Sequence, residues 1–267
     1  MITSTGNGKI KELVRLKKSA KERAKKGVFL VEGPKMFREI PHGLCLEVYG
    51  SEAFFLTQEG AAARKKAAAD GIVPETVSDA VFQYLSDTQS PQGILAVVKQ
   101  LGYGLKDLTD GDCPLMVILE NLQDPGNLGT ILRTAEAAGV TGILLSQGCA
   151  DIYNPKVTRS TMGSIFRVPF VYTDDLKGAI ARLKERGVRM LAAHLDGSIG
   201  LYEASFTAPA AILIGNESRG LTEETAALAD QAIRIPMSGS VESLNAAVAT
   251  AVCLFEARRQ RSLPAQE

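Results

Sequence analysis

The sequence has no long hydrophobic run, although 45% of its 267 residues are hydrophobic. No stretch approaches the roughly 18 apolar residues of a membrane-spanning helix, and the N-terminus lacks the apolar segment of a secretory signal. We therefore expect a cytoplasmic protein that makes no contact with membranes. With 22% charged residues, the composition is that of a globular protein with a substantial buried core.

Side chains that commonly bind metals or form disulfides are few and widely spaced. The two histidines, His42 and His194, fall in different predicted domains, which argues against a zinc site and against a histidine-centred catalytic triad. The chain has four cysteines and no CxxC pair. We predict no metal and no disulfide framework, and we expect buried thiols in a reducing compartment at Cys45, Cys113, Cys149 and Cys253.

The glycine patterns of common nucleotide-binding folds are also absent. Neither G-x-G-x-x-G nor G-x-x-x-x-G-K-[ST] stands at a strand-to-helix junction. A dinucleotide-dependent oxidoreductase and a triphosphate-binding enzyme are therefore disfavoured.

The whole chain has no excess of charge of one sign, because its formal net charge is zero, but its first 26 residues are strongly basic. They contain nine Lys or Arg and two Glu, a local net charge of +7. A basic face of this kind can bind nucleic-acid phosphates even on a neutral protein, while a solvated amphipathic helix is the alternative. The candidate phosphate-binding side chains are Lys9, Lys11, Arg15, Lys17, Lys18 and Arg23.

Two regions of alternating strand-like and helix-like segments follow one another along the chain. In the first hundred residues the apolar runs span 28–33, 44–50 and 93–98, and the helix-like segments span 34–40, 58–69 and 78–85. Residues 100–113 lose this periodicity and gather Gly and Asp, which is typical of a linker. We therefore predict a small α/β domain at 1–104 and a second domain at 113–267.

The second region predicts a mostly parallel sheet covered by helices on both faces. Its strand-like runs are continuously apolar and separated by helix-like segments. The runs span 115–120, 142–146, 189–195, 210–215 and 232–236, and the helices span 128–138, 173–186 and 223–229. A final helix carries Leu244, Ala247, Val248, Ala251 and Phe255 at helical spacing.

Polar loops that contain glycine follow three of these strands, at 121–129, 215–220 and 237–245. Ligands of such sheets bind at the carboxyl ends of the strands, so these loops are the predicted binding site. Asn127 of the first loop and Arg133 of the helix that follows it are six residues apart, which is about 240° around an ideal helix. They can therefore share a site only if Asn127 lies in the helix cap or if Arg133 serves a neighbouring subunit.

Three segments carry a family resemblance. DPGNLGTILRTAEAAGV (124–140), NPKVTRSTMGSIFRVPF (154–170), and LIGNESRGLT (213–222) with IRIPMSGSVESLNAAVATAVCLFEARRQR (233–261) resemble the three successive motifs of the SpoU/TrmH family. This family, within the SPOUT superfamily, comprises S-adenosylmethionine-dependent RNA ribose 2′-O-methyltransferases. The resemblance covers residues 113–261. The first hundred residues more loosely resemble the L30e-like substrate-binding domain of the ribosomal-RNA members.

The resemblance implies a fold that general topology rules would reject, because knots are nearly absent from proteins. It implies a SPOUT domain with a deep trefoil knot, which forms the cofactor pocket, and a homodimer. Gly215, Ile235 and Leu244 would bind S-adenosylmethionine largely through backbone groups. The walls of the pocket would be shaped by Asn216, Gly220, Pro236 and Met237.

The family's polar catalytic positions match Asn127, Arg133, Glu217, Ser243 and Asn245. An arginine corresponding to Arg133 has been proposed as the base, but a guanidinium stays protonated, so we favour it as a positioner of the adjacent phosphate. The alternatives are a salt bridge from Arg133 to Glu136, helix capping near Thr222 by Glu217, and capping of the last helix by Ser243 or Asn245. The reaction needs no metal.

The resemblance also bears on the partner. It makes the basic N-terminal side chains predicted RNA contacts, and it adds Lys156 and Arg159 of the second motif, which contact either RNA or the dimer partner. The presence of an L30e-like region favours 23S-type ribosomal RNA as substrate. A tRNA guanosine 2′-O-methyltransferase and a non-catalytic RNA-binding protein remain the alternatives.

Overall fold

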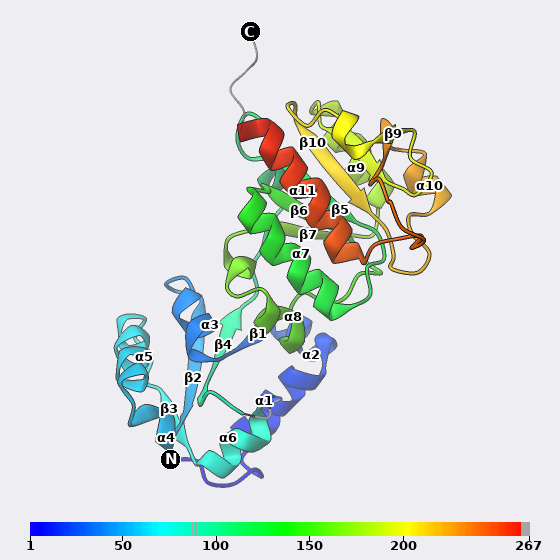
Figure 1. Ribbon diagram of the computed structural model, residues 1–267. Coiled ribbons are helices and arrows are strands. Elements are labelled where there is room, and N and C mark those ends of the chain that lie inside the picture. The colour runs from blue at the N-terminus through cyan, green and yellow to red at the C-terminus, as the bar shows by residue number, and fades with distance from the viewer. Residues whose placement is uncertain (87, 89, 263–267) are drawn as a thin grey trace. The chain divides into compact units, whose positions relative to one another are not determined.

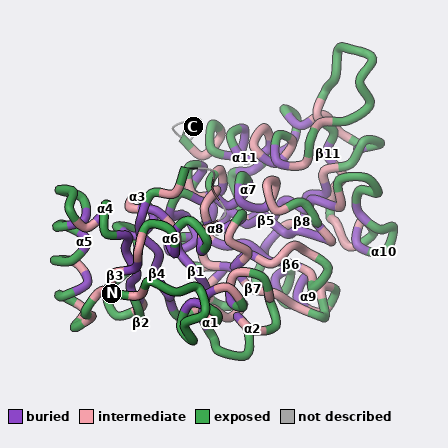
Figure 2. The backbone as a smooth tube through the Cα atoms, turned by 90° about the horizontal axis from the view of Figure 1, so that it is seen from below, coloured by how far each residue is buried: buried purple, intermediate pink, exposed green. Residues whose placement is uncertain are grey.

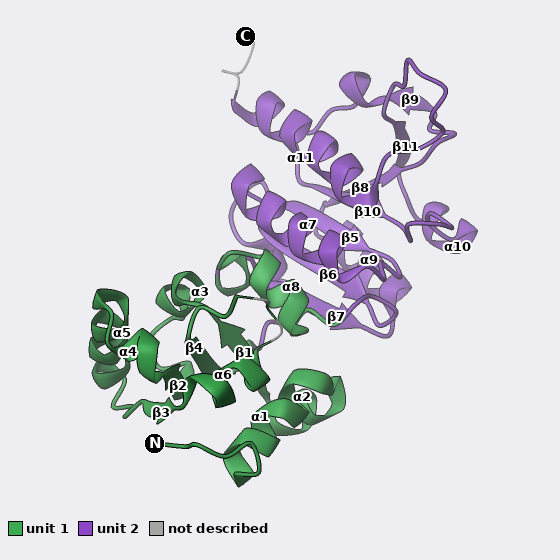
Figure 3. Ribbon diagram, turned by 60° about the horizontal axis from the view of Figure 1, so that its bottom comes forward, with its two compact units in different colours: residues 1–101, 151–166 green, residues 102–150, 167–267 purple. Residues whose placement is uncertain are grey.

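The computed structural model describes residues 1–86, 88 and 90–262, and the chain divides into two compact units. Unit 1 comprises residues 1–101 and 151–166, and unit 2 comprises residues 102–150 and the chain from 167 onward (Figure 3). Unit 1 thus includes a segment of the second motif. The functional boundaries at 1–104 and 113–267 stay a prediction. Within the predicted linker, η1 (Leu105–Thr109) places Leu108 in the core of unit 2.

Unit 1 is built on a four-stranded sheet in the order β1-β4-β2-β3. The strands are β1 (Val28–Glu32), β2 (Cys45–Ser51), β3 (Glu75–Val77) and β4 (Ile94–Lys99). The pairs β1–β4 and β2–β4 are antiparallel, and β2–β3 is parallel. The helices of unit 1 are α1 (Gly8–Lys18), α2 (Ala20–Lys26), α3 (Pro34–Glu39), α4 (Glu52–Phe55), α5 (Gln58–Ala69), α6 (Asp79–Leu85) and α8 (Pro155–Ser160), and η2 (Ser164–Phe166) follows α8.

The basic N-terminal segment forms two amphipathic helices. In α1, Ile10, Leu13 and Leu16 are buried and pack with residues of α6 and of the strands, so most of its cations lie on the opposite, solvated face. The side chain of Ser19 accepts a hydrogen bond from the backbone of Glu22 and so caps α2. The predicted amphipathic helix is confirmed, and its solvated face remains available to phosphates.

The described part of unit 2 contains a seven-stranded sheet in the order β7-β6-β5-β10-β8-β11-β9. Every pairing in it is parallel, which confirms the predicted sheet type. The strands are β5 (Leu115–Leu119), β6 (Gly142–Ser146), β7 (Phe170–Thr173), β8 (Arg189–Ala193), β9 (Ile199–Gly200), β10 (Ala210–Ile214) and β11 (Gln231–Arg234).

Helices cover both faces of this sheet, as predicted. Helix α9 (Leu176–Glu185) packs Ile180 and Leu183 in one cluster with Met116 and Ile118 of β5. Helices α7 (Pro125–Ala138) and α11 (Ala246–Ser262) lie side by side on the other face (Figure 1). The short α10 (Glu223–Ala226) and η3 (Leu201–Glu203) complete the unit.

Several boundaries and short elements differ from the predictions. Helix α7 begins at Pro125 rather than near Leu128, because Asp124 caps it and proline suits the first turn. Helix α9 begins at Leu176 because residue 173 still belongs to β7. The strands β3, β7 and β9 and the helices α4 and α8 have two to six residues and were not predicted.

The cysteines are all free thiols, and their burial partly corrects the prediction. Cys45 and Cys253 are buried, Cys149 is half-buried, and Cys113 is exposed. None of the described helices combines the length and apolar character that a bilayer crossing requires.

Candidate active site

A cleft of about 300 Å³ opens in unit 2 at the carboxyl ends of β8, β10 and β11. Three segments that follow these strands supply most of its lining: residues 194–196, 215–221 and 235–246. The cleft lies at the edge of the sheet where the polar loops predicted a binding site.

The structure brings most of the predicted cofactor contacts into this one cleft. The predicted residues among its lining are Gly215, Asn216, Gly220, Ile235, Met237 and Leu244, together with Glu217 and Ser243 of the predicted catalytic set. Pro236, Asn127, Arg133 and Asn245 are not among its described lining residues. Sequence reasoning missed Asp196 and Glu242, which also line the cleft. Asp196 stands outside the recognised motifs, whereas Glu242 lies beside Ser243 in the third motif, and that position could have identified it.

The loop after β10 is a tight turn that only glycine permits at one position. Asn216 and Gly220 exchange two backbone hydrogen bonds of 2.9 Å. A Cβ atom on Gly215 would lie 2.0 Å from the carbonyl carbon of Gly220, far inside van der Waals contact. Gly220 itself has φ +68°, a left-handed conformation that glycine adopts without strain. Backbone groups therefore form this wall of the cleft.

The side chain of Asn216 fastens this turn to the loop after β5. Its Nδ2 donates to the carbonyl of Asn121 at 2.8 Å, and its Oδ1 accepts from the backbone N–H groups of Ser218 and Arg219 at 3.0 and 3.2 Å. Since both ends of the amide have partners, Asn216 shapes the wall rather than offering a free group to a ligand.

The carboxylate of Glu217 is surrounded by hydrogen-bond donors from the start of α7. Its Oε1 accepts from the backbone of Asp124 at 2.9 Å and from Nδ2 of Asn127 at 3.0 Å, and its Oε2 accepts from the backbone of Gln123 at 3.2 Å. Burial opposes ionisation, but these hydrogen bonds outweigh it, so the pKa of Glu217 lies below its usual value. The alternative that Glu217 caps a helix near Thr222 is wrong, because the side chain of Thr222 itself caps α10.

Asn127 and Asn245 are brought together although 118 positions separate them. Nδ2 of Asn245 donates to Oδ1 of Asn127 at 2.9 Å. Oδ1 of Asn245 accepts from the backbone of Ala247 and Val248 at 2.9 and 3.3 Å and so caps α11. The capping alternative for Asn245 is therefore confirmed, and the same side chain also orients Asn127.

Arg133 lies apart from this cluster. Asn127 is the third residue of α7, after the cap at Asp124, and it is therefore part of the helix. Arg133 follows it by six residues, so the side chains of Asn127 and Arg133 leave the helix on different sides. Arg133 is exposed and makes no hydrogen bond or ion pair with the residues the structure describes. Glu136, its alternative partner, is instead bound by Arg167, whose Nη2 lies 3.1 Å from Oε2.

A buried carboxylate that the sequence analysis overlooked fixes the other end of the turn. Glu120 is 6% exposed and accepts hydrogen bonds from the backbone and hydroxyl of Thr222, both at 2.8 Å, and from the hydroxyl of Thr225 at 2.6 Å. The sequence does contain a signal for Glu120, since it ends an apolar strand. A carboxylate at such a position is costly to bury and therefore indicates hydrogen-bond partners. Glu120 thus ties residues 215–222 to the end of β5.

The predicted RNA contacts lie in unit 1, and Arg23 requires a correction. Lys11, Arg15 and Lys18 are exposed, and Lys9 pairs with Glu75. Arg23 is only 3% exposed; its guanidinium donates to the carbonyl of Leu16 at 2.7 Å and pairs with Asp151. This side chain stabilises the interior of unit 1, so the prediction that it contacts RNA is wrong.

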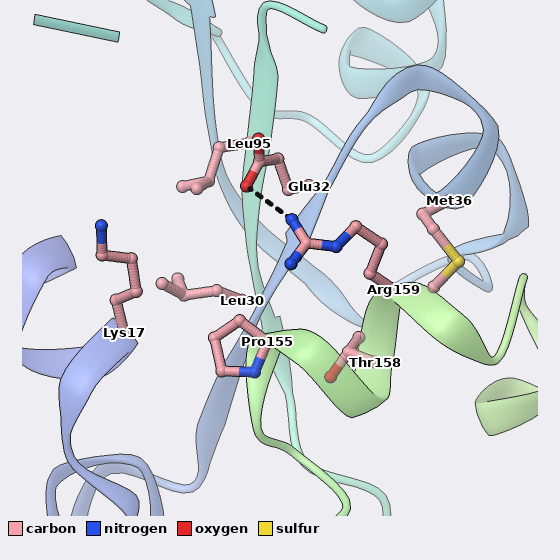
Figure 4. Close-up of a pocket in the computed structure, with 8 residues that line it drawn as sticks. All are labelled: Lys17, Leu30, Glu32, Met36, Leu95, Pro155, Thr158 and Arg159. Carbon is pink, nitrogen blue, oxygen red and sulfur yellow. Dashed lines mark ion pairs between the residues drawn. The ribbon is translucent and has the colours of Figure 1, made fainter. Parts of the chain in front are cut away.

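Two of the remaining cations, from distant parts of the sequence, line one small cavity of unit 1. Lys17 and Arg159 both line it, and Arg159 points toward Glu32 (Figure 4). Nη1 of Arg159 lies 3.9 Å from the Glu32 carboxylate, and Nζ of Lys17 donates to the carbonyl of Leu85 at 2.9 Å. The cavity holds about 10 Å³, room for a single water molecule, so a nucleotide can contact these cations only from outside. Lys156 is exposed.

Within residues 1–86, 88 and 90–262, no group of three or more His, Cys, Asp or Glu side chains is arranged to hold a metal ion.

Comparisons with known proteins match both parts of the chain. The model of the SpoU rRNA methylase family matches residues 114–255, and that of the MRM3-like substrate binding domain matches residues 7–96. The chain is 33% identical to the uncharacterized tRNA/rRNA methyltransferase slr1673 of Synechocystis, over 97% of this chain and 94% of the relative. It is 30% identical to the 23S rRNA (guanosine(2553)-2′-O)-methyltransferase RlmP of Bacillus subtilis, over 96% and 98%.

A solved structure resembles the whole chain. The AdoMet-bound rRNA methyltransferase of Sinorhizobium meliloti is 31% identical, with a TM-score of 0.86 over 97% of each chain.

Proposed function

The chain belongs to the SpoU rRNA methylase family, and on this basis we propose that it transfers a methyl group from S-adenosylmethionine to a ribose 2′-hydroxyl of 23S-type ribosomal RNA. The relatives that are similar over nearly the full length support ribosomal RNA rather than tRNA. We place the reaction in the cytoplasm.

The observation that carries the proposal is the cleft formed by the loops after β8, β10 and β11. Its volume of about 300 Å³ lies at the lower end of the range for small-molecule sites. The wall at Gly215 has no room for a side chain, so a ligand there meets backbone N–H and C=O groups. Residues 215, 235 and 244 would hold S-adenosylmethionine by such groups, with Pro236 and Met237 beside them. A knotted path of the chain around this cleft is part of the proposal.

S-adenosylmethionine supplies an electrophilic methyl group, and the protein has to align a ribose oxygen with it. We assign Asn127 to this work, because Glu217 and Asn245 hold its amide in one orientation while the amide keeps one hydrogen and one lone pair for a ribose hydroxyl. Glu217 accepts hydrogen bonds from the backbone of Gln123 and Asp124 and from the side chain of Asn127, and these bonds stabilise its ionised form. We therefore assign Glu217 to positioning the loop before α7 rather than to removing the proton. Ser243, which lines the cleft, would contact the substrate.

Arg133 supplies the remaining charge, and we propose that it acts in the site of a second subunit. Asn127 and Arg133 of one subunit leave α7 on different sides, so both residue types can act in one reaction when Asn127 of one subunit meets Arg133 of the other. The exposed apolar side chains of Val248 and Phe255, on the neighbouring α11, suit a homodimer interface. Its guanidinium would position the phosphate adjacent to the attacking ribose and stabilise the alkoxide that develops as the 2′-hydroxyl passes its proton to solvent water.

Unit 1 would grip the RNA through the solvated face of α1 and through α8. Phosphate contacts of this kind position a folded RNA without reading its sequence. The contacts would come from Lys9, Lys11, Arg15, Lys17, Lys18, Lys156 and Arg159.

Two measurements test the proposal. Calorimetric titration with S-adenosylmethionine should show binding; RNA binding without cofactor binding would favour a non-catalytic RNA-binding protein. Mass spectrometric mapping of 2′-O-methylated nucleotides in rRNA from cells with and without the protein should show one missing site. An unchanged rRNA map with a lost tRNA modification would establish the tRNA alternative.

A further inference from the structure

The corner between α4 and α5 in unit 1 carries an arginine stacked on an aromatic ring. The guanidinium carbon of Arg64 lies 3.9 Å from the ring centroid of Phe55. Nη2 of Arg64 also approaches the hydroxyl of Thr76 at 3.5 Å, a long contact that restrains the guanidinium. Arg64 nevertheless stays exposed, and Figure 2 shows much of α5 in the colour of exposed residues.

The ring beneath Arg64 is held by the backbone of β2. A Cβ atom on Gly50 would lie 2.2 Å from Cζ of Phe55, so the ring occupies the space that any other residue at position 50 would fill. Backbone, ring and guanidinium therefore form three successive layers. A cation–π contact accounts for the inner face of the guanidinium, while its outer side meets solvent.

Two cations at this stack can attract an anionic partner, while the nearby acids are Glu52 at the start of α4 and Asp79, which accepts from the backbone of Ala53. Arg64 forms no ion pair with the described residues, and neither does its exposed neighbour Lys65. Leu56, which follows Phe55, is 89% exposed and adds apolar surface at the same corner. A planar cation beside a second free cation offers both a stacking surface and phosphate attraction, which are the two components of single-stranded RNA binding.

We infer that Arg64 and Phe55 form a stacking site for an unpaired base of the RNA substrate, with Lys65 near the flanking phosphate. This inference rests on the proposed function, because it requires RNA as the ligand. The site lies on α4 and α5, separate from the basic face of α1. It lets unit 1 contact the base of an unpaired nucleotide, whereas phosphate contacts involve no base.

The test compares two fluorescent probes of equal charge: a 12-nucleotide adenine oligoribonucleotide and a 12-unit abasic ribose-phosphate chain. The wild-type protein should bind the adenine probe more tightly. Arg64→Lys keeps the charge and removes the planar guanidinium, so it should weaken adenine binding roughly tenfold and leave abasic binding unchanged. Lys65→Ala is the matched control, and it should weaken both probes alike, by about two- to threefold.

A wild-type protein without preference for the adenine probe overturns the inference, as does an Arg64→Lys protein that retains the wild-type preference. Replacing one adenine by 2-aminopurine gives a second readout, since its fluorescence should be quenched on stacking in the wild type and less in Arg64→Lys. Transfer of labelled methyl groups to rRNA by the wild type is measured in parallel. Its failure would refute the proposed function, whereas the two-probe comparison addresses the stacking site by itself.

Discussion

Nδ2 of Asn245 donates a hydrogen bond of 2.9 Å to Oδ1 of Asn127. The residue that caps α11 is thereby joined to the polar cluster at the start of α7. Glu217 bonds the other end of the same amide at 3.0 Å. The orientation of Asn127 is therefore set by two loops far apart in the sequence, and substitution of either partner should disturb it.

Asn245→Asp separates the two roles of that residue. An aspartate still caps α11 but cannot donate to Asn127, so stability should stay near that of the wild type while methyl transfer falls at least tenfold. Asn245→Ala loses the cap as well and should cost about 1 kcal/mol of unfolding free energy. Thermal unfolding and initial rates of methyl transfer report the two effects. A fully active Asn245→Asp enzyme would refute the role of this hydrogen bond.

Glu217→Gln should destabilise the loop before α7 at neutral pH, because the amide NH₂ would face a backbone donor. A carboxyl whose pKa is lowered on folding stabilises the protein above its unfolded pKa of about 4.3 and loses this effect as the pH falls through the folded value. The difference in melting temperature between wild type and variant should therefore be largest at neutral pH and shrink as the pH is lowered below about 4.3. A constant difference over that range would contradict the assignment.

Gly215→Ala should weaken binding of S-adenosylmethionine at least tenfold, since the added methyl group would overlap the backbone of Gly220. Gly239→Ala is the control. It lies in the loop before α11, where an added Cβ meets nothing within 4 Å. Calorimetry should find cofactor affinity unchanged in this control, and equal losses in both variants would point to a general effect of loop stiffening.

Arg133→Ala and Asn127→Ala should each lose nearly all activity when either variant is expressed alone. The proposed homodimer makes a further test possible. If Arg133 serves the partner's site, mixed dimers regain one intact site, and random pairing should restore about a quarter of wild-type activity. Co-expression with two affinity tags allows the mixed dimer to be isolated and assayed. The absence of recovery would place both residues in the same subunit's site.

Arg23→Ala should destabilise the protein by about 3 kcal/mol, because it leaves a partly buried Asp151 and two backbone carbonyls without their donor. Lys18→Ala, on the exposed face of α1, should leave the melting temperature unchanged. Its RNA affinity should decrease, and the slope of log K against log salt should fall by about one. The reverse pattern would show that Arg23 contacts RNA.

The parts of the fold that follow from periodicity were accessible from the sequence. The strand at 142–146 and the helix at 58–69 have their predicted bounds, since the apolar pattern and flanking residues mark both ends. The pairing of Asn127 with Asn245 was not accessible, because no pattern within either loop specifies a partner 118 positions away.

The burial of Arg23 was not accessible from periodicity. Leu16 lies in α1 and Arg23 in α2, with the chain extended at Ser19 between them, so no helical spacing links the two, and the charge of Arg23 placed it with the solvated cations. The short α8 could not be inferred in the same way, since six residues give too few turns for a periodic pattern.

The inclusion of residues 151–166 in unit 1 means that this unit is not a contiguous piece of chain. Tyr153 and Phe166 stack near Phe29 at centroid distances of 4.7 and 6.0 Å. A fragment that stops at residue 104 would leave that ring uncovered and Arg23 without its counter-ion. An expression fragment of unit 1 should therefore carry residues 151–166 on a short artificial connection, and the simple truncation should aggregate.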